Sequence, residues 1–100
     1  MEASLTHEEF TKNANTKFQV PVDDESSPVE IELIDVTELK IYPQQEEFTL
    51  TFRGPLNAFL DQGVRPFQHD QMGEFELFIV PVKQDADGFY YEAVFNRIRE

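Results

Sequence analysis

Cysteine is absent from the sequence, and basic residues are few, with 8 Lys and Arg against 20 Asp and Glu. The lack of cysteine excludes disulfides, thiolate zinc sites and a cysteine nucleophile. No hydrophobic run approaches the roughly 20 residues that a helix needs to span a bilayer. The opening segment, MEASLTHEEF, also lacks the basic and apolar regions of a secretory signal peptide. We therefore expect a cytoplasmic protein with no membrane partner.

The formal net charge of −12 at pH 7 narrows the range of partners. Such a charge repels nucleic-acid phosphates and anionic lipid surfaces, so we expect neither as a ligand. Solubility is the simplest explanation of an excess of one charge. The sharper alternative is a basic partner, or mimicry of nucleic acid toward a protein that normally binds it.

Residues 73–96 have the pattern of a long β-hairpin, around which the rest of the chain is organised. Phe75, Leu77 and Ile79 alternate with residues on the other face, which is the period of a strand with one buried side. Residues 78–82 are apolar on both faces, so this half should be covered on two sides. Residues 85–88, DADG, form the predicted four-residue loop.

The register of this hairpin follows from placing Gln84 opposite Phe89. Cross-strand pairs of matched character contribute about 0.2–1 kcal/mol each. Pro81 cannot donate to the ladder, so its nitrogen should face an edge or a bulge. Counting outward predicts Val82 opposite Tyr91, Val80 opposite Ala93, Phe78 opposite Phe95, Glu76 opposite Arg97 and Glu74 opposite Arg99.

A short helix is predicted at about residues 7–13, near the start of the chain. Thr6 as N-cap with Glu9 makes a capping box, and Leu5 with Phe10 makes a hydrophobic staple. Asn13 or Asn15 is suited to end the helix. We expect His7, in its first turn, to face solvent.

Six strands are predicted at about 17–22, 29–41, 46–53, 64–70, 74–82 and 89–98, with turns at 23–28 and 42–45. A phase change near Leu33 and Ile34 predicts a β-bulge. Pro66 interrupts the fourth strand, which we place at an edge. A helical turn at 56–60 would plug an open barrel end with Leu56, Phe59 and Leu60. The predicted fold is an all-β single domain over residues 1–100, an antiparallel barrel or sandwich with one short N-terminal helix.

Candidate chemistry is sparse. His69 shares a face with Phe67 and should be partly buried, and half-buried histidines usually hydrogen-bond a carbonyl or carboxylate. The two histidines have no HxH or HExxH spacing, and neither the 23–25 nor the 85–88 carboxylates complete a calcium loop. We predict no catalytic residue, no cofactor and no metal. An enzyme using His69 is the weakest alternative.

Three segments carry a family resemblance: residues 50–55 (LTFRGP), 73–82 (GEFELFIVPV) and 91–96 (YEAVFN). With the QG that ends the loop at 62–63 and the histidine before a turn, the chain resembles a family of small bacterial proteins of unknown function. Arg65 and Pro66 depart from the family pattern, in which an aromatic and a charged residue are expected. The resemblance implies an accessory or assembly role beside phage-tail-like proteins, and no catalytic residue or cofactor.

These observations predict a non-enzymatic protein-binding or assembly module, with an acidic decoy for a nucleic-acid-binding protein as the alternative. The predicted contact surfaces are the strand at 64–70, the loop at 56–63 and the aromatic residues 89–91. The partner-binding residues predicted there are Phe59, Arg65, Phe67, His69, Phe89 and Tyr90.

Overall fold

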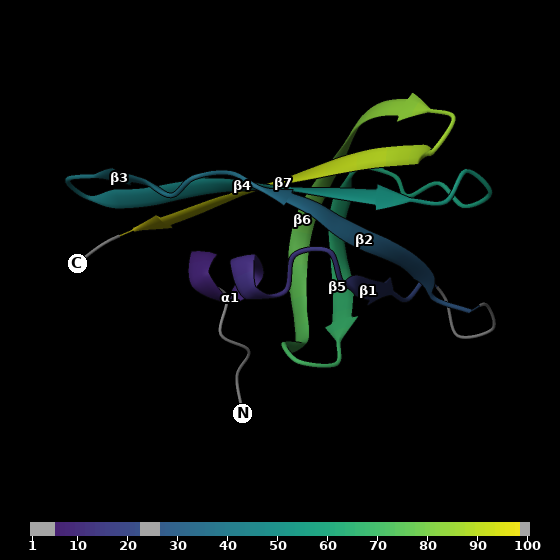
Figure 1. Cartoon of the computed structure of the whole chain (residues 1–100), viewed down its shortest axis with the longest axis horizontal. Coiled ribbons are helices and arrows are strands. Elements are labelled where there is room, and N and C mark those ends of the chain that lie inside the picture. Colours follow the sequence, from purple (N-terminus) through teal and green to yellow (C-terminus); the bar gives the residue numbers. More distant parts are fainter. Residues whose placement is uncertain (1–5, 23–26, 99–100) are drawn as a thin grey trace.

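A computed structural model describes residues 6–22 and 27–98, with one helix and seven strands in these segments (Figure 1). Every strand pairing is antiparallel. The elements are α1 (His7–Lys12), β1 (Lys17–Val20), β2 (Val29–Val36), β3 (Lys40–Tyr42), β4 (Gln45–Gly54), β5 (Gly63–His69), β6 (Gly73–Asp85) and β7 (Gly88–Ile98).

The strands close into a barrel. Their order is β2-β1-β5-β6-β7-β4-β3, and a further pairing of β2 with β4 joins the two sides, so six strands form the barrel. The predicted class, an antiparallel barrel or sandwich with a short N-terminal helix, is confirmed as a barrel. β3 lies outside it on β4, in an arm that projects from the barrel with the end of β7 (Figure 1).

The core is built by the inward side of each strand and by one side chain of α1. Strands β1, β2 and β4 alternate buried with more exposed residues, because successive side chains point to opposite faces. Phe10 of α1 is fully buried among Phe48, Phe75 and Phe95. The core residues are Phe10, Phe18, Val20, Ile31, Leu33, Phe48, Leu50, Phe52, Leu60, Phe67, Met72, Leu77, Ile79, Tyr91 and Ala93.

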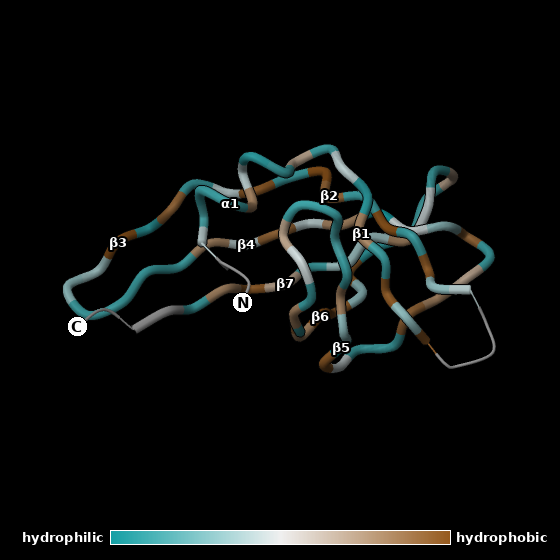
Figure 2. Tube along the Cα trace, turned by 90° about the horizontal axis from the view of Figure 1, so that it is seen from below, coloured by the Kyte–Doolittle hydropathy of each residue, from teal (hydrophilic) through white to brown (hydrophobic). Residues whose placement is uncertain are grey.

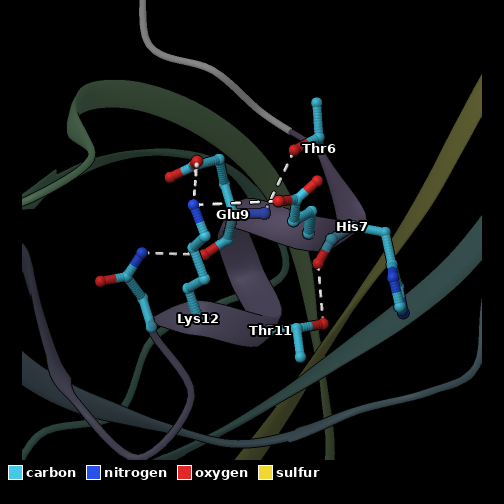
Figure 3. Close-up of polar contacts among 7 residues, drawn as sticks. Thr6, His7, Glu9, Thr11 and Lys12 are labelled. Atoms are coloured by element: carbon cyan, nitrogen blue, oxygen red, sulfur yellow. Dashed lines mark hydrogen bonds and ion pairs between the residues drawn. The ribbon is translucent and has the colours of Figure 1, made fainter.

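Helix α1 begins where the capping box predicted. The Thr6 side chain accepts a hydrogen bond from the backbone N–H of Glu9 at 3.1 Å, and Asn13 is the C-cap (Figure 3). Leu5, the other half of the predicted staple, lies outside the described residues. The expectation that His7 faces solvent is wrong. Its ring packs edge-on against Phe48, and its Nε2 donates to the Thr37 carbonyl at 2.9 Å.

The second predicted strand is two strands. β2 ends at Val36, and β3 begins only at Lys40. Thr37 interrupts the strand. Its N–H donates to the Thr49 carbonyl, and its hydroxyl accepts a hydrogen bond from the Thr49 N–H. Its carbonyl accepts the hydrogen bond from His7 Nε2. The predicted bulge is confirmed, because the β2–β4 register shifts between Leu33 and Asp35.

The register of the β6–β7 hairpin is right near the turn and wrong farther out. Gln84 pairs with Phe89, as predicted, and Asp85 with Gly88, so the loop has two residues rather than four. Val82 then forms a bulge beside Pro81. Beyond it the pairs are shifted by one: Tyr91 pairs with Pro81 instead of Val82, and Val80 with Glu92 instead of Ala93.

The predicted pairs of Phe78 with Phe95 and of Glu76 with Arg97 are wrong because β6 changes partners. Its first half pairs with β5, while the end of β7 continues along β4. Arg99 lies outside the described residues. Phe78 therefore pairs with Val64 instead of Phe95, Glu76 with Pro66 instead of Arg97, and Glu74 with Gln68; Arg97 pairs through its backbone with Glu46.

Three smaller expectations also change. β5 is not an edge strand, since it lies between β1 and β6, although a single pair, Gln19 with Gln68, joins it to β1. The loop after β4 has a turn at 56–57 but no helix, and only Leu60 of the three predicted plugs is buried. β1 ends at Val20 rather than residue 22, and most of the predicted 23–28 turn lies outside the described residues.

Candidate functional site

His69 lies at the end of β5, where the chain turns into β6. Its Nδ1 accepts hydrogen bonds from the backbone N–H groups of Gln71 and Met72 at 3.0 and 3.1 Å. The proton of the neutral ring is therefore on Nε2, which donates to the Thr16 hydroxyl at 2.8 Å. Burial lowers the pKa of His69, and the charge of Asp70 opposes this effect. Nδ1 thus holds the β5–β6 turn in place, and Nε2 links this turn to Thr16, just before β1.

A polar groove of about 460 Å³ lies beside His69. Gln19 stands opposite both Glu30 and Gln68, and its side-chain amide donates to Glu30 at 2.8 Å. No group of three His, Asp or Glu side chains among the described residues is placed to hold a metal. The groove is lined by Lys17, Gln19, Glu30, Gln68, His69, Asp70, Gly73 and Glu74.

An aromatic cluster of Phe59, Phe89 and Tyr91 forms where the loop at 55–62 meets β7. The Phe59 ring lies 5.0 Å from Phe89, edge to face, and 6.4 Å from Tyr91. Tyr91 is fully buried, and its hydroxyl accepts a hydrogen bond from the Leu60 N–H at 3.0 Å. Burial raises the pKa of Tyr91. The neighbouring Phe59 is 51% exposed, so the cluster presents one ring to solvent, and that ring is supported by Phe89 and the buried Tyr91.

Arg65 lies under the same loop. It sits on the inward side of β5, and its Nη2 donates to the Asp61 carbonyl at 3.1 Å. Its Nε is buried without a hydrogen-bond partner in the described part of the chain. Its bond to Asp61, two residues after Phe59, places the guanidinium near the cluster, and its positive charge opposes the rise in the pKa of the Tyr91 hydroxyl. Of the predicted partner-binding residues, the fold therefore brings Phe59, Arg65 and Phe89 together.

Tyr90 points the other way, onto the outer surface of the barrel. Its hydroxyl donates to the Asp85 carboxylate at 3.2 Å, and the Lys83 ammonium lies 4.5 Å from the centre of its ring. A backbone hydrogen bond from Asp87 is the main cause that lowers the pKa of Asp85. Tyr90 is thus fixed in a polar setting apart from Phe59 and Phe89.

Arg53 stands opposite Tyr90 and continues this polar surface across β2 and β1. The Arg53 guanidinium and the Lys17 ammonium both contact one oxygen of Glu32, at 3.3 and 3.5 Å. A groove of about 580 Å³ lies beside the segment formed by Arg53, Gly54 and Pro55. Both charge signs line it, so it has no clear preference for an anion or a cation. Its lining is Lys17, Glu30, Glu32, Arg53, Gly54, Pro55 and Asp87.

Phe67 is fully buried, so its prediction as a partner-binding residue is wrong. Its ring stacks 5.7 Å from Phe75 and contacts Phe18 and Phe52. The alternation of Phe67 and His69 placed both on the inward face correctly. It gave no sign that Phe67 would be enclosed inside the barrel by Phe18, Phe52 and Phe75.

An outer patch of Val64, Phe78 and Val94 was not predicted. The apolar character of both faces at 78–82 led us to expect cover on two sides, yet Phe78 is 50% exposed. Val64, its cross-strand partner, is 61% exposed, and Val94 is 60% exposed. The double-sided apolar run was the sequence signal for this surface.

Within the described segments, no helix is both long and apolar enough to cross a membrane. No curated protein and no solved structure matches the chain. A family model described as a domain of unknown function, DUF6916, matches residues 5–95. That span includes the helix, strands β1 to β6, most of β7, and the three segments whose resemblance we noted, apart from Asn96. The chain therefore belongs to the DUF6916 family of domains of unknown function.

Proposed function

We propose that the protein is a non-enzymatic protein-binding or assembly module, with the loop at 55–62 as its contact surface. The observation that carries this proposal is the placement of Phe59. Its ring is half exposed, yet Phe89 and the buried Tyr91 support it from below. Aromatic anchors dominate protein interfaces, and an anchor held in place before binding loses little conformational entropy.

The fixing of the loop supports the same proposal. The Leu60 N–H bond to Tyr91 and the Arg65 bond to the Asp61 carbonyl tie the loop to the barrel at the two residues that follow Phe59. An apolar side chain that packs on the exposed part of the Phe59 ring is thus the chemistry that this surface would recognise.

The proposal is tested by affinity capture from a lysate of the source organism at low and high salt. We compare the wild type with Phe59→Ser and with Tyr42→Ser, which removes an aromatic ring of similar exposure on the distant arm. We expect a salt-tolerant partner, captured at least about tenfold less by Phe59→Ser and unchanged by Tyr42→Ser. Circular dichroism checks that both variants are folded.

Other outcomes decide against the proposal. Equal capture by Phe59→Ser, or capture of no specific protein, would refute it. A basic partner that is released at high salt would instead support the acidic decoy. The identity of the captured protein also tests the association with phage-tail-like proteins, which stays a prediction from the resemblance. An enzyme using His69 likewise stays a prediction, with both ring nitrogens engaged.

A further inference from the structure

The outer patch is an apolar surface built across three strands. Val64 on β5 and Phe78 on β6 are direct cross-strand partners with both side chains outward. Val80 on β6 pairs with Glu92 on β7, and this is the last pair between the two strands. Phe78 lies two residues before Val80, and Val94 lies two residues after Glu92. Phe78 and Val94 are therefore the next outward residues beyond the last β6–β7 pair.

The charged residues nearest this patch are acidic. Along the outward positions of β5, β6 and β7 they are Glu74, Glu76 and Glu92, and Lys83, beyond the Val82 bulge, is paired with Asp85 at 4.0 Å. None of the three glutamates forms an ion pair within the described part of the chain. Glu32, by contrast, is paired with both Lys17 and Arg53. Unpaired carboxylates around an apolar centre attract an apolar group that is flanked by cations.

The same charges decide which occupant fits. A second copy of the chain would bring the three glutamates against their equivalents, and like charges across an interface are unfavourable. A protein segment with an apolar side chain between Lys or Arg residues matches both the apolar centre and the surrounding carboxylates. We propose that the outer patch of Val64, Phe78 and Val94 binds such a basic amphipathic segment of another protein. This inference rests on the proposed protein-binding function and adds a second surface with a defined partner chemistry.

The test is an NMR titration of the ¹⁵N-labelled full chain with a seven-residue peptide that alternates Lys with Leu. The matched probe is the same peptide with Glu in place of Lys. We expect amide shifts concentrated at 64–68, 74–80 and 92–96 with the basic peptide, and none with the acidic one. Phe78→Ser should weaken binding at least about tenfold, because it removes the largest apolar contact. Ile41→Ser, which changes an apolar residue of comparable exposure on the arm, should leave binding unchanged.

A variant with fewer charges separates the contribution of the surrounding carboxylates to binding from that of the apolar centre. Replacing Glu76 and Glu92 by Gln should weaken binding of the basic peptide and flatten its dependence on salt. The inference is overturned if the basic peptide shifts amides evenly over the acidic surface, or if Phe78→Ser binds as the wild type does. Should the peptide fail while lysate capture still depends on Phe59, the outer patch is wrong and the proposed function stands. Binding that depends on Phe78 supports the patch even where lysate capture fails.

Discussion

Single residues in this barrel show how far side-chain chemistry can be predicted from sequence. The partial burial of His69 followed from its alternation with Phe67, whereas its partners are two backbone N–H groups and a hydroxyl rather than the expected carbonyl or carboxylate. The placement of His7 did not follow from the sequence, because its acceptor is the carbonyl of Thr37, 30 residues away, in a strand break that the hydrophobic pattern conceals. Long-range hydrogen bonds of this kind leave no local sequence signal.

His69 should make stability depend on pH. Burial lowers its pKa from 6.5, so below about pH 6.5 the unfolded chain binds a proton that the folded protein resists. Its contribution to the free energy of unfolding is complete above that pH and is lost as pH falls through the lowered pKa. Urea unfolding between pH 7.5 and 5.5 should show this fall in the wild type. His69→Asn, which keeps an acceptor near Nδ1, should show a shallower fall, and equal slopes would contradict the assignment.

Elements were predicted best where the sequence carries a change of phase. The bulge between Leu33 and Asp35 was visible because the apolar residues switch from odd to even positions. The bulge at Val82 was invisible, since the run Val80, Pro81, Val82 is apolar throughout and has no phase to change. The change of partner by β6 was equally hidden. Pairing with β5 and pairing with β7 both require the same kind of β-forming residues in β6, so the sequence does not show where one partner replaces the other.

The β6–β7 turn depends on Gly88. A Cβ there would lie within 2.2 Å of the Gly54 carbonyl oxygen on β4, and its φ of +155° is unfavourable for other residues. Gly88→Ala should lose about 1–2 kcal/mol from the backbone and about 1–3 kcal/mol more from the clash. Gly73→Ala is the control, since φ is +82° but no atom lies within 4 Å of the added carbon. Chemical denaturation compares them, and equal losses would show that β4 can move away.

For the whole molecule, six strands with turn signals were enough to predict an antiparallel barrel or sandwich. Closure itself was not predictable, because it depends on the β2–β4 pairing, whose register is displaced by the bulge. The candidate surfaces were predicted in part. Phe59, Arg65 and Phe89 do lie together, while Tyr90 and the buried Phe67 lie elsewhere. The exposure of individual side chains could not be inferred from the alternation of apolar and polar residues. That alternation shows which residues share a face of a strand, but not whether other elements cover the face.

The net charge of −12 should make the folded protein more stable in salt. Compaction brings like charges together, and raising NaCl from about 0.01 to 0.15 M shortens the screening length from about 30 to 8 Å. We expect the midpoint temperature of unfolding to rise over this range. Replacing Glu74, Glu76 and Glu92 by Gln should reduce the rise. A midpoint that falls with salt would mean that ion pairs such as Glu32 with Arg53 outweigh the general repulsion.

The strand order has one further consequence, at the junction of β1 with β5. Gln19 and Gln68 are the single pair there, whereas each other junction of the barrel has at least four. His69 compensates, because its bond to Thr16 and its ring 4.2 Å from Phe18 hold the two strands together. Acid adds its proton at Nδ1, which displaces the Gln71 and Met72 N–H groups and loosens the β5–β6 turn, while the Nε2 bond to Thr16 is kept. Loss of the Thr16 hydroxyl, rather than acid, would therefore free β1 from β5 and open the cylinder along that line.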